Sequence, residues 1–283
     1  MKPSPCRNIF RVGSLGLLLT KFFLTAAGAE SPSRSLPSDI SAAPPSSALS
    51  IAAASNLVYV LDELNAAFRS REPEVILAVA VAASGSLVAQ IQHGAPYDIF
   101  LSADLDHPQA LVSRGSAEAN SLFTFAVGQL VLWTNNPAVH LGTVAATVRS
   151  EAVHRIAVAN AETAPYGRAA KQVLEKIGAW REIQGKLVYG ENITQTAQFV
   201  ETGSADIGFV ALSLVLSPKL KERGRWIPVP DDQHESLAHG AVLTRKGAKN
   251  TMAIRYLEFL RSADARTILG RYGYRAPEPA PGE

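Results

Sequence analysis

Four short groups of small, hydroxyl-bearing or amide-bearing residues each stand between an apolar run and an amphipathic helix. They are Ala54-Ser55-Asn56, Ala83-Ser84-Gly85-Ser86, Ala164-Pro165-Tyr166-Gly167 and Glu191-Asn192-Ile193-Thr194. The first turn of a helix carries backbone N–H groups without helical partners and about half a positive charge. Four such helix starts that converge would bind a small anion without any Lys or Arg. The chemistry that these groups indicate is capture of an oxyanion, not a reaction.

The candidate ligand-binding residues are Ser55, Asn56, Ser84, Tyr166 and Ile193. The serine hydroxyls and the Asn56 amide can donate hydrogen bonds. The proline before Tyr166 favours a helix start at the tyrosine, whose O–H can donate to an anion. Ile193 can contribute only its backbone N–H. Two alternatives stay open: Ser55 could be a plain helix cap, and the Tyr166 ring could simply pack over the helix start.

Neutral donors of this kind suit a small, fully charged oxyanion. A protonated oxyanion such as hydrogen phosphate would need a hydrogen-bond acceptor in the site. Glu191 is the acid among the four groups, and we expect it to face solvent.

Because no candidate residue titrates between roughly pH 6 and pH 8, the affinity for the anion should be constant over this range.

Short apolar runs alternate with helical patterns along the chain, which is typical of parallel sheets in an α/β fold. The predicted strands are 49–54, 75–82, 98–102, 125–134, 155–159, 187–189, 206–210 and 240–244. The predicted helices are 56–69, 87–93, 167–176, 194–202, 251–260 and 264–271. In such sheets ligands bind beyond the carboxyl ends of the strands, where the four groups fall.

The chain has 283 residues, more than one hydrophobic core usually holds, so we expect two lobes. Residues 49–127 and 240–276 are predicted to form lobe I, and residues 128–239 lobe II. The stretch 125–134 is predicted to be one long strand that crosses between them. The expected arrangement is two similar α/β domains joined by crossing strands, with a ligand cleft between them.

The N-terminal 29 residues have the composition of a secretory signal peptide. A basic start precedes an apolar stretch, and Ala27-Gly28-Ala29 matches a signal-peptidase site, so we predict a secreted protein with cleavage after Ala29. An uncleaved anchor is the alternative. Residues 30–48 are Ser/Pro-rich and predicted to be a disordered tether, and 277–283 a disordered tail.

Composition excludes several classes of protein. Four of the 27 Lys and Arg residues precede residue 30, which leaves 23 against 25 acids and argues against nucleic acid as a partner. Cys6 is the sole cysteine and lies in the predicted signal, so disulfides and cysteine nucleophiles are not expected after cleavage.

Several segments together resemble the periplasmic molybdate-binding proteins of ABC uptake systems. These segments are AAASN, Ser-Gly-Ser with the following AQIQHGAPYDIFLSAD, TAPYGRAAKQVLEKIGAW and GENITQTAQFVETGSADIGFVALS. The resemblance extends from about Leu49 to Tyr274, in the expected order.

The resemblance implies the two-lobed α/β fold of type II periplasmic binding proteins and a location in the periplasm. It also implies a non-enzymatic receptor that binds molybdate and tungstate and delivers them to a membrane permease with its ATPase. It implies hydroxyl or amide donors at Ser55, Asn56 and Ser84, and the backbone N–H of Ile193. It also implies the subgroup with a ligand tyrosine at the third helix start, here Tyr166, because Ala211 stands where other members have that tyrosine. We expect no cofactor, and a monomer; molybdenum would be held as molybdate.

Three alternatives remain. The ligand could be another tetrahedral oxyanion, such as sulfate or phosphate. A secreted serine hydrolase would need a base and an orienting acid near Ser55 or Ser84, whereas the six histidines are predicted to be scattered over helix ends and loops. Metal sites at 231–235 or at Asp104-x-Asp106-His107 are also conceivable, although neither has a recognised ligand spacing and charged loops are usually solvated.

Overall fold

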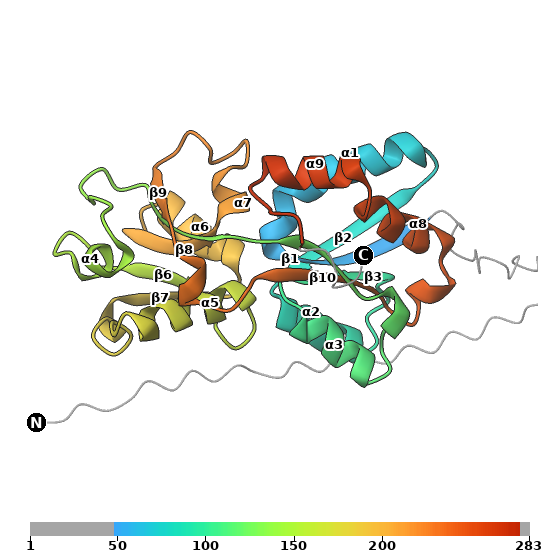
Figure 1. Ribbon diagram of the computed structural model, residues 1–283, viewed down its shortest axis with the longest axis horizontal. Helices are drawn as coiled ribbons and strands as arrows, with labels where there is room; N and C mark the ends of the chain where they lie inside the picture. Colours follow the sequence, from blue (N-terminus) through green and yellow to red (C-terminus); the bar gives the residue numbers. More distant parts are fainter. Residues whose placement is uncertain (1–47, 278–283) are drawn as a thin grey trace, which may run out of the picture. The chain divides into compact units, whose positions relative to one another are not determined.

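The computed structural model describes residues 48–277. The predicted signal peptide lies outside these residues, as do all but one residue of the predicted tether and all but one of the predicted tail. The described residues form two five-stranded sheets, each with its own helices (Figure 1).

The first sheet has the strand order β2-β1-β3-β10-β4. Its members are β1 (Ala48–Ala54), β2 (Ile76–Ala82), β3 (Ile99–Leu101), β4 (Phe123–Val127) and β10 (Ala238–Leu243). β1 pairs in parallel with β2 and β3, whereas β10 runs antiparallel to β3 and β4. The carboxyl ends of β1 and β2 therefore lie at one edge, directly before the first two predicted helix starts.

The second sheet repeats this plan with the order β7-β6-β8-β5-β9. Its members are β5 (Leu130–Thr134), β6 (Ile156–Ala159), β7 (Leu187–Gly190), β8 (Ile207–Ala211) and β9 (Arg225–Pro228). β6 pairs in parallel with β7 and β8, and β5 is antiparallel to β8 and β9. The last two predicted helix starts follow β6 and β7.

Helices cover the sheets on both faces, as the buried apolar strands predict. The α-helices are α1 (Val58–Arg71), α2 (Ser84–Gln92), α3 (Asp106–Ser113), α4 (Val144–Arg149), α5 (Pro165–Lys176), α6 (Ile193–Glu201), α7 (Leu212–Val215), α8 (Thr251–Leu260) and α9 (Ala263–Arg271). In Figure 1, α1, α8 and α9 lie on one side of the first sheet, and α2 and α3 lie on the other.

Strand β1 shows how the sequence produces this layering. Ile51 and Ala53 belong to the core on the α1 side, while Ala52, between them, packs with Leu87 of α2 and Phe100 of β3. Successive side chains of a strand point to opposite faces, so an unbroken apolar run is what a sheet covered on both faces requires.

The stretch 125–134, predicted as one long strand, consists of two strands that belong to different sheets. β4 ends at Val127 and β5 begins at Leu130, so Gly128 and Gln129 form the crossing. Both strands are apolar, and the two-residue break carries too little sequence signal to separate them. The second crossing is the segment from β9 to β10. The short elements α3, α4, α7 and β9 were not predicted, because four to eight residues display too little periodicity.

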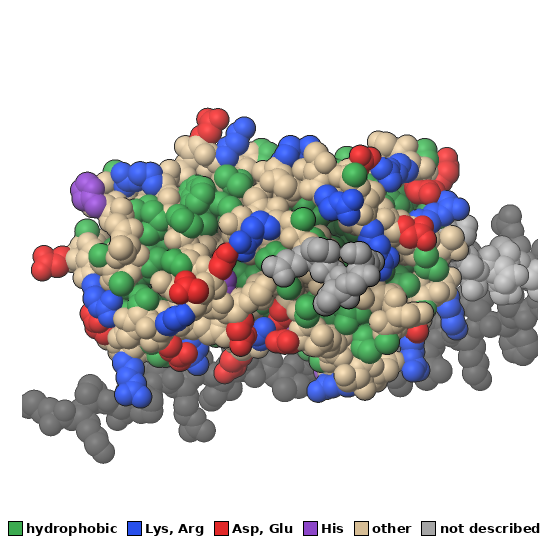
Figure 2. Space-filling model, viewed as in Figure 1, with side chains coloured by type: hydrophobic (Ala, Val, Ile, Leu, Met, Phe, Trp, Pro, Cys, Tyr) green, Lys and Arg blue, Asp and Glu red, His purple; other side chains and the backbone are tan. Residues whose placement is uncertain are grey.

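Within residues 48–277, no helix is both long enough and apolar enough to cross a membrane. On the face seen in Figure 2, Lys and Arg side chains are interspersed with Asp and Glu, and no patch of one sign dominates. This mixed surface agrees with the near balance of charges in the sequence.

Candidate anion-binding site

The four predicted helix starts meet at one pocket between the two sheets. The pocket is small, with a cavity volume of about 10 Å³. Its lining consists of Ala54, Ser55, Asn56, Ala83, Ser84, Ala103, Ala164, Pro165, Tyr166 and Ile193. All five candidate residues are therefore brought together, and this lining contains no ionisable group other than the phenol of Tyr166.

Tyr166 lines this pocket and carries a hydroxyl donor that lies next to Gly128 at the crossing. Its side chain is buried, and its Oη has no hydrogen-bond partner among the described residues. Burial raises the pKa of Tyr166 well above its usual value, so the hydroxyl keeps its proton. A buried O–H without a partner costs free energy, and an anion in the pocket would remove that cost.

The first turn of α6 leaves one particular N–H free. Asn192 caps the helix by accepting from the backbone N–H groups of Thr194 (3.0 Å) and Gln195 (3.1 Å). The cap does not reach the backbone N–H of Ile193, the first helical residue, and this residue lines the pocket. The sequence identified Ile193 as a backbone donor, and the capping geometry explains why its N–H is the one available.

Ser84 is held with its hydroxyl proton available. The backbone N–H of Ala103 donates to Ser84 Oγ at 3.1 Å, so a lone pair of the oxygen is occupied. A hydroxyl still has its own proton to donate. No side chain caps α2, although the next backbone N–H, that of Gly85, already donates to Thr163 O.

Ser55 is the first residue of a 3-10 turn, η1 (Ser55–Leu57), that continues into α1. Its hydroxyl makes no capping hydrogen bond there, so the plain-cap alternative does not hold. The Ser55 carbonyl instead accepts from Thr194 Oγ1 at 2.9 Å, which ties the first helix start to the fourth. The Ser55 hydroxyl is therefore left for a ligand.

Asn56 differs from the prediction in one respect. Its side-chain amide was expected to donate to the anion, but Nδ2 already donates to Tyr274 Oη and contacts His239 Nε2, both at 2.7 Å. Two partners use both amide hydrogens. Asn56 lines the pocket, so its contribution to an anion would come from the backbone N–H of the turn.

His239 is a buried residue that the sequence reasoning placed among helix ends and loops. It lies inside β10 and is fully buried, next to Asn56 and to the ring of Tyr166. Burial lowers the pKa of His239 to about 4, so it is neutral at pH 7 and adds no positive charge behind the site. The predicted strand began at residue 240, so His239 fell just outside it and its burial was not anticipated.

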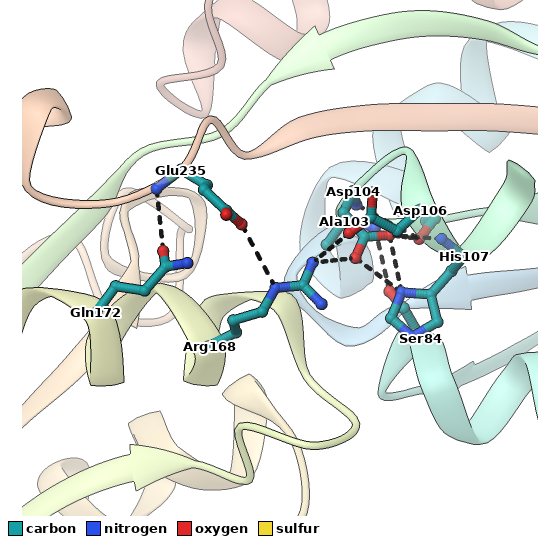
Figure 3. Close-up of polar contacts among 9 residues, drawn as sticks. Ser84, Ala103, Asp104, Asp106, His107, Arg168, Gln172 and Glu235 are labelled. Atoms are coloured by element: carbon teal, nitrogen blue, oxygen red, sulfur yellow. Dashed lines mark hydrogen bonds and ion pairs between the residues drawn. The ribbon is translucent and has the colours of Figure 1, made fainter.

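An ion-pair network joins the two lobes beside the pocket (Figure 3). Arg168 of α5 donates to Asp104 Oδ2 at 2.7 Å and to Asp106 Oδ2 at 3.1 Å. A backbone hydrogen bond from Gly85 to Thr163 O, 2.9 Å long, crosses at the same place. The lobes are thus closed over the pocket.

Asp104 is buried, whereas its charged loop was expected to be solvated. Burial alone would raise the pKa of Asp104, but hydrogen bonds from His107 and Ser102 lower it overall. His107 Nδ1 lies 2.7 Å from Asp104 Oδ2. No three His, Cys, Asp or Glu side chains within residues 48–277 are grouped as a metal site would require.

A larger cavity of about 600 Å³ lies elsewhere, at the crossing segments. Asp231 and Arg275, which line it, pair with each other at 2.6 Å. It contains Gly128 but none of the four helix starts. We therefore assign the anion site to the smaller pocket, where donors converge.

Known proteins share this fold and much of this sequence. The molybdate-binding protein ModA of Rhodobacter capsulatus is 38% identical over 223 residues, covering 79% of this chain and 86% of the relative. ModA of Azotobacter vinelandii is 40% identical over 191 residues, covering 68% and 75%. The solved structure of the Azotobacter vinelandii periplasmic molybdate-binding protein superposes with a TM-score of 0.77 at 30% identity, covering 81% of this chain and all of that one.

The family description "bacterial extracellular solute-binding protein" matches residues 49–275, nearly all the described chain. The two-lobed α/β fold predicted from the sequence is the fold of these proteins, and the resemblance noted above is confirmed. By sequence match and by fold, the chain belongs to the family of bacterial extracellular solute-binding proteins.

Proposed function

We propose that this protein captures molybdate, and tungstate as an ion of the same charge and shape, in the periplasm and delivers it to an ABC importer. The observation that carries the proposal is a pocket lined by uncharged donor residues from four helix starts, one of which, Tyr166, has a buried hydroxyl without a partner among the described residues. The similarity to molybdate-binding relatives supports this choice of oxyanion.

The available donors suffice energetically. They are the hydroxyls of Ser55, Ser84 and Tyr166 and the backbone N–H groups of Asn56 and Ile193. Hydrogen bonds to a charged group contribute about 1.5–3 kcal/mol each, and micromolar affinity requires about −8 kcal/mol. Five such bonds can reach that affinity after part of their strength offsets the lost hydration of the dianion.

The lobes supply donors from both sides, so closure and binding are coupled. Ser55, Asn56 and Ser84 follow strands of the first sheet, while Tyr166 and Ile193 follow strands of the second. An anion at the centre would attract both sets of dipoles and favour the closed arrangement. Release to a permease then requires the lobes to separate.

Isothermal titration calorimetry of the mature protein tests the proposal. Sub-micromolar binding of molybdate and tungstate is expected, with sulfate and phosphate at least 100-fold weaker. Heat with sulfate or phosphate alone would reject the molybdate assignment in favour of another tetrahedral oxyanion. Native mass spectrometry of protein from a periplasmic extract should show a retained oxyanion, a chain that begins at Glu30, and a monomer.

A hydrolase is the second candidate, because the Asp104–His107 pair resembles an acid that orients a base beside Ser84. Against it, the Ser84 hydrogen bond found among the described residues is with the Ala103 backbone and not with His107. We propose that the protein is not an enzyme. Turnover of generic esters that disappears in Ser84→Ala would overturn this.

A further inference from the structure

The buried His239 has no part in the donor set described above, yet it lies directly behind it. It stands in β10 beside a register shift of the strand and has no exposed surface. The rings of Phe125, Tyr166 and Tyr274 surround it, each at a steep angle to the imidazole. An imidazole enclosed in this way has few possible hydrogen-bond partners for its two nitrogens, so the partners that it has determine its tautomer.

The carbonyl of Leu237 fixes the tautomer. His239 Nδ1 lies 2.8 Å from this oxygen, which can only accept, so Nδ1 carries the proton. The pKa of about 4 leaves the ring neutral at pH 7, and Nε2 then has a lone pair. Asn56 Nδ2, 2.7 Å away, is therefore the donor to Nε2.

The second amide hydrogen of Asn56 begins a closed ring of hydrogen bonds. Asn56 Nδ2 donates to Tyr274 Oη, and Tyr274 can donate to Ser213 Oγ at 3.1 Å. Ser213 Oγ donates to the Asn56 carbonyl at 2.9 Å. The ring returns to the residue where it started and includes α7 of the second lobe, so Asn56 is held at its side chain and its backbone.

We propose that His239 is the positioning residue of the first anion-binding turn: its neutral imidazole fixes the Asn56 amide and, through it, the Asn56 backbone N–H that binds the oxyanion. This inference rests on the proposed function. His239 touches no ligand itself; it acts through Asn56.

Proton uptake by His239 would reverse the polarity of this network. With hydrogens on both nitrogens, Nε2 could no longer accept from Asn56, and the amide would have to rotate and offer Oδ1. That oxygen is buried without a partner among the described residues. The titratable groups facing His239 are the phenols of Tyr166 and Tyr274, which stay neutral, and the charge of Asp104, which favours protonation.

The test compares His239→Leu with His239→Gln. Leu removes the acceptor, and we expect molybdate affinity to fall at least 10-fold. Gln restores an acceptor oxygen near the position of Nε2, and it should recover most of that loss. His93→Leu is the matched control, because His93 is exposed at the end of α2. Equal affinity of wild type and His239→Leu, or equally weak binding by the Leu and Gln variants, would overturn the proposal.

A spectroscopic readout separates positioning from general stability. Nitrogen-15 NMR of the ligand-free protein should show His239 protonated on Nδ1 alone at pH 7, with slowly exchanging Asn56 side-chain hydrogens. A proton on Nε2 would contradict the positioning role of His239, whether or not the protein binds molybdate. Failure of wild type to bind molybdate would instead reject the proposed function. Should the Leu variant not fold, the tautomer measured in wild type decides: a proton on Nδ1 alone supports the proposal, and a proton on Nε2 at pH 7 overturns it.

Discussion

The guanidinium of Arg168 lies 2.7 Å from Asp104 Oδ2, and this ion pair joins the helix that carries Tyr166 to the loop beside Ser84. Asp104 is buried whereas Arg168 is about one-third exposed. A charge pair with one buried partner resists separation more than a fully exposed pair does. The two lobes are therefore held together beside the pocket by an ion pair between residues outside its lining.

We expect Arg168→Gln to release molybdate faster. Loss of one partner of such a pair acts mainly on dissociation, so the dissociation rate should rise about 3- to 10-fold with little change in association. Stopped-flow tryptophan fluorescence measures both rates. Arg255→Gln is the control, because Arg255 pairs with Glu72 within the first lobe. Equal dissociation rates in the two variants would argue against an interlobe latch.

Loss of one hydroxyl donor should weaken binding without harming the fold. Tyr166→Phe and Ser84→Ala should each cost about 1–3 kcal/mol in molybdate affinity by calorimetry. Since Tyr166 Oη has no partner within residues 48–277, Tyr166→Phe should leave the melting temperature unchanged or raise it. Tyr189→Phe, at an exposed tyrosine, is the control. Wild-type affinity in both site variants would refute the site assignment.

Gly128 leaves the space that Tyr166 occupies at the crossing between the sheets. A Cβ at this position would overlap Tyr166 Oη and would lie 2.7 Å from His239 Cε1. Gly128→Ala should therefore destabilise the closed arrangement by about 1–3 kcal/mol and weaken molybdate binding about 10- to 100-fold. Gly185→Ala, where nothing lies within 4 Å, should bind normally in the same calorimetric titration. Equal binding by the two variants would show that the space is not needed.

The four helix starts could be predicted because each depends on local sequence: an apolar strand, then residues that begin a helix. Strand ends of parallel sheets converge, so the topology brought the four groups together. The role of Asn56 could not be predicted in the same way. Its partners His239 and Tyr274 are 183 and 218 residues away, and no local pattern indicates which side-chain hydrogens such partners will use.

The crossing strand was predicted wrongly for a related reason. Hydrophobicity is continuous from Phe125 to Thr134 apart from Gly128 and Gln129, and a pattern of apolar residues does not reveal that a strand changes sheets. Long-range pairing decides where the strand changes sheets, because β4 pairs with β10 and β5 pairs with β8. The burial of Asp104 likewise depends on Arg168, which is 64 residues away.

Acid should destabilise the protein through His239. The unfolded chain binds a proton at this imidazole near pH 6.5, whereas burial lowers the pKa in the folded protein to about 4. Above pH 6.5 neither state is protonated and His239 has no effect. As pH falls from 6.5 to 4, only the unfolded state gains the proton, so up to about 3 kcal/mol of unfolding free energy is lost.

Urea unfolding at pH 7.0 and pH 4.5 measures this loss in wild type and in His239→Gln. Wild type should lose about 2–3 kcal/mol more than the variant over this interval, because Gln does not titrate. The pKa values of Asp104 and Asp206 are also lowered in the folded protein, and their protonation weakens both proteins alike, so the difference isolates His239. Equal losses would mean that the imidazole is free to protonate in the folded protein, and the neutral contact with Asn56 would then be ruled out.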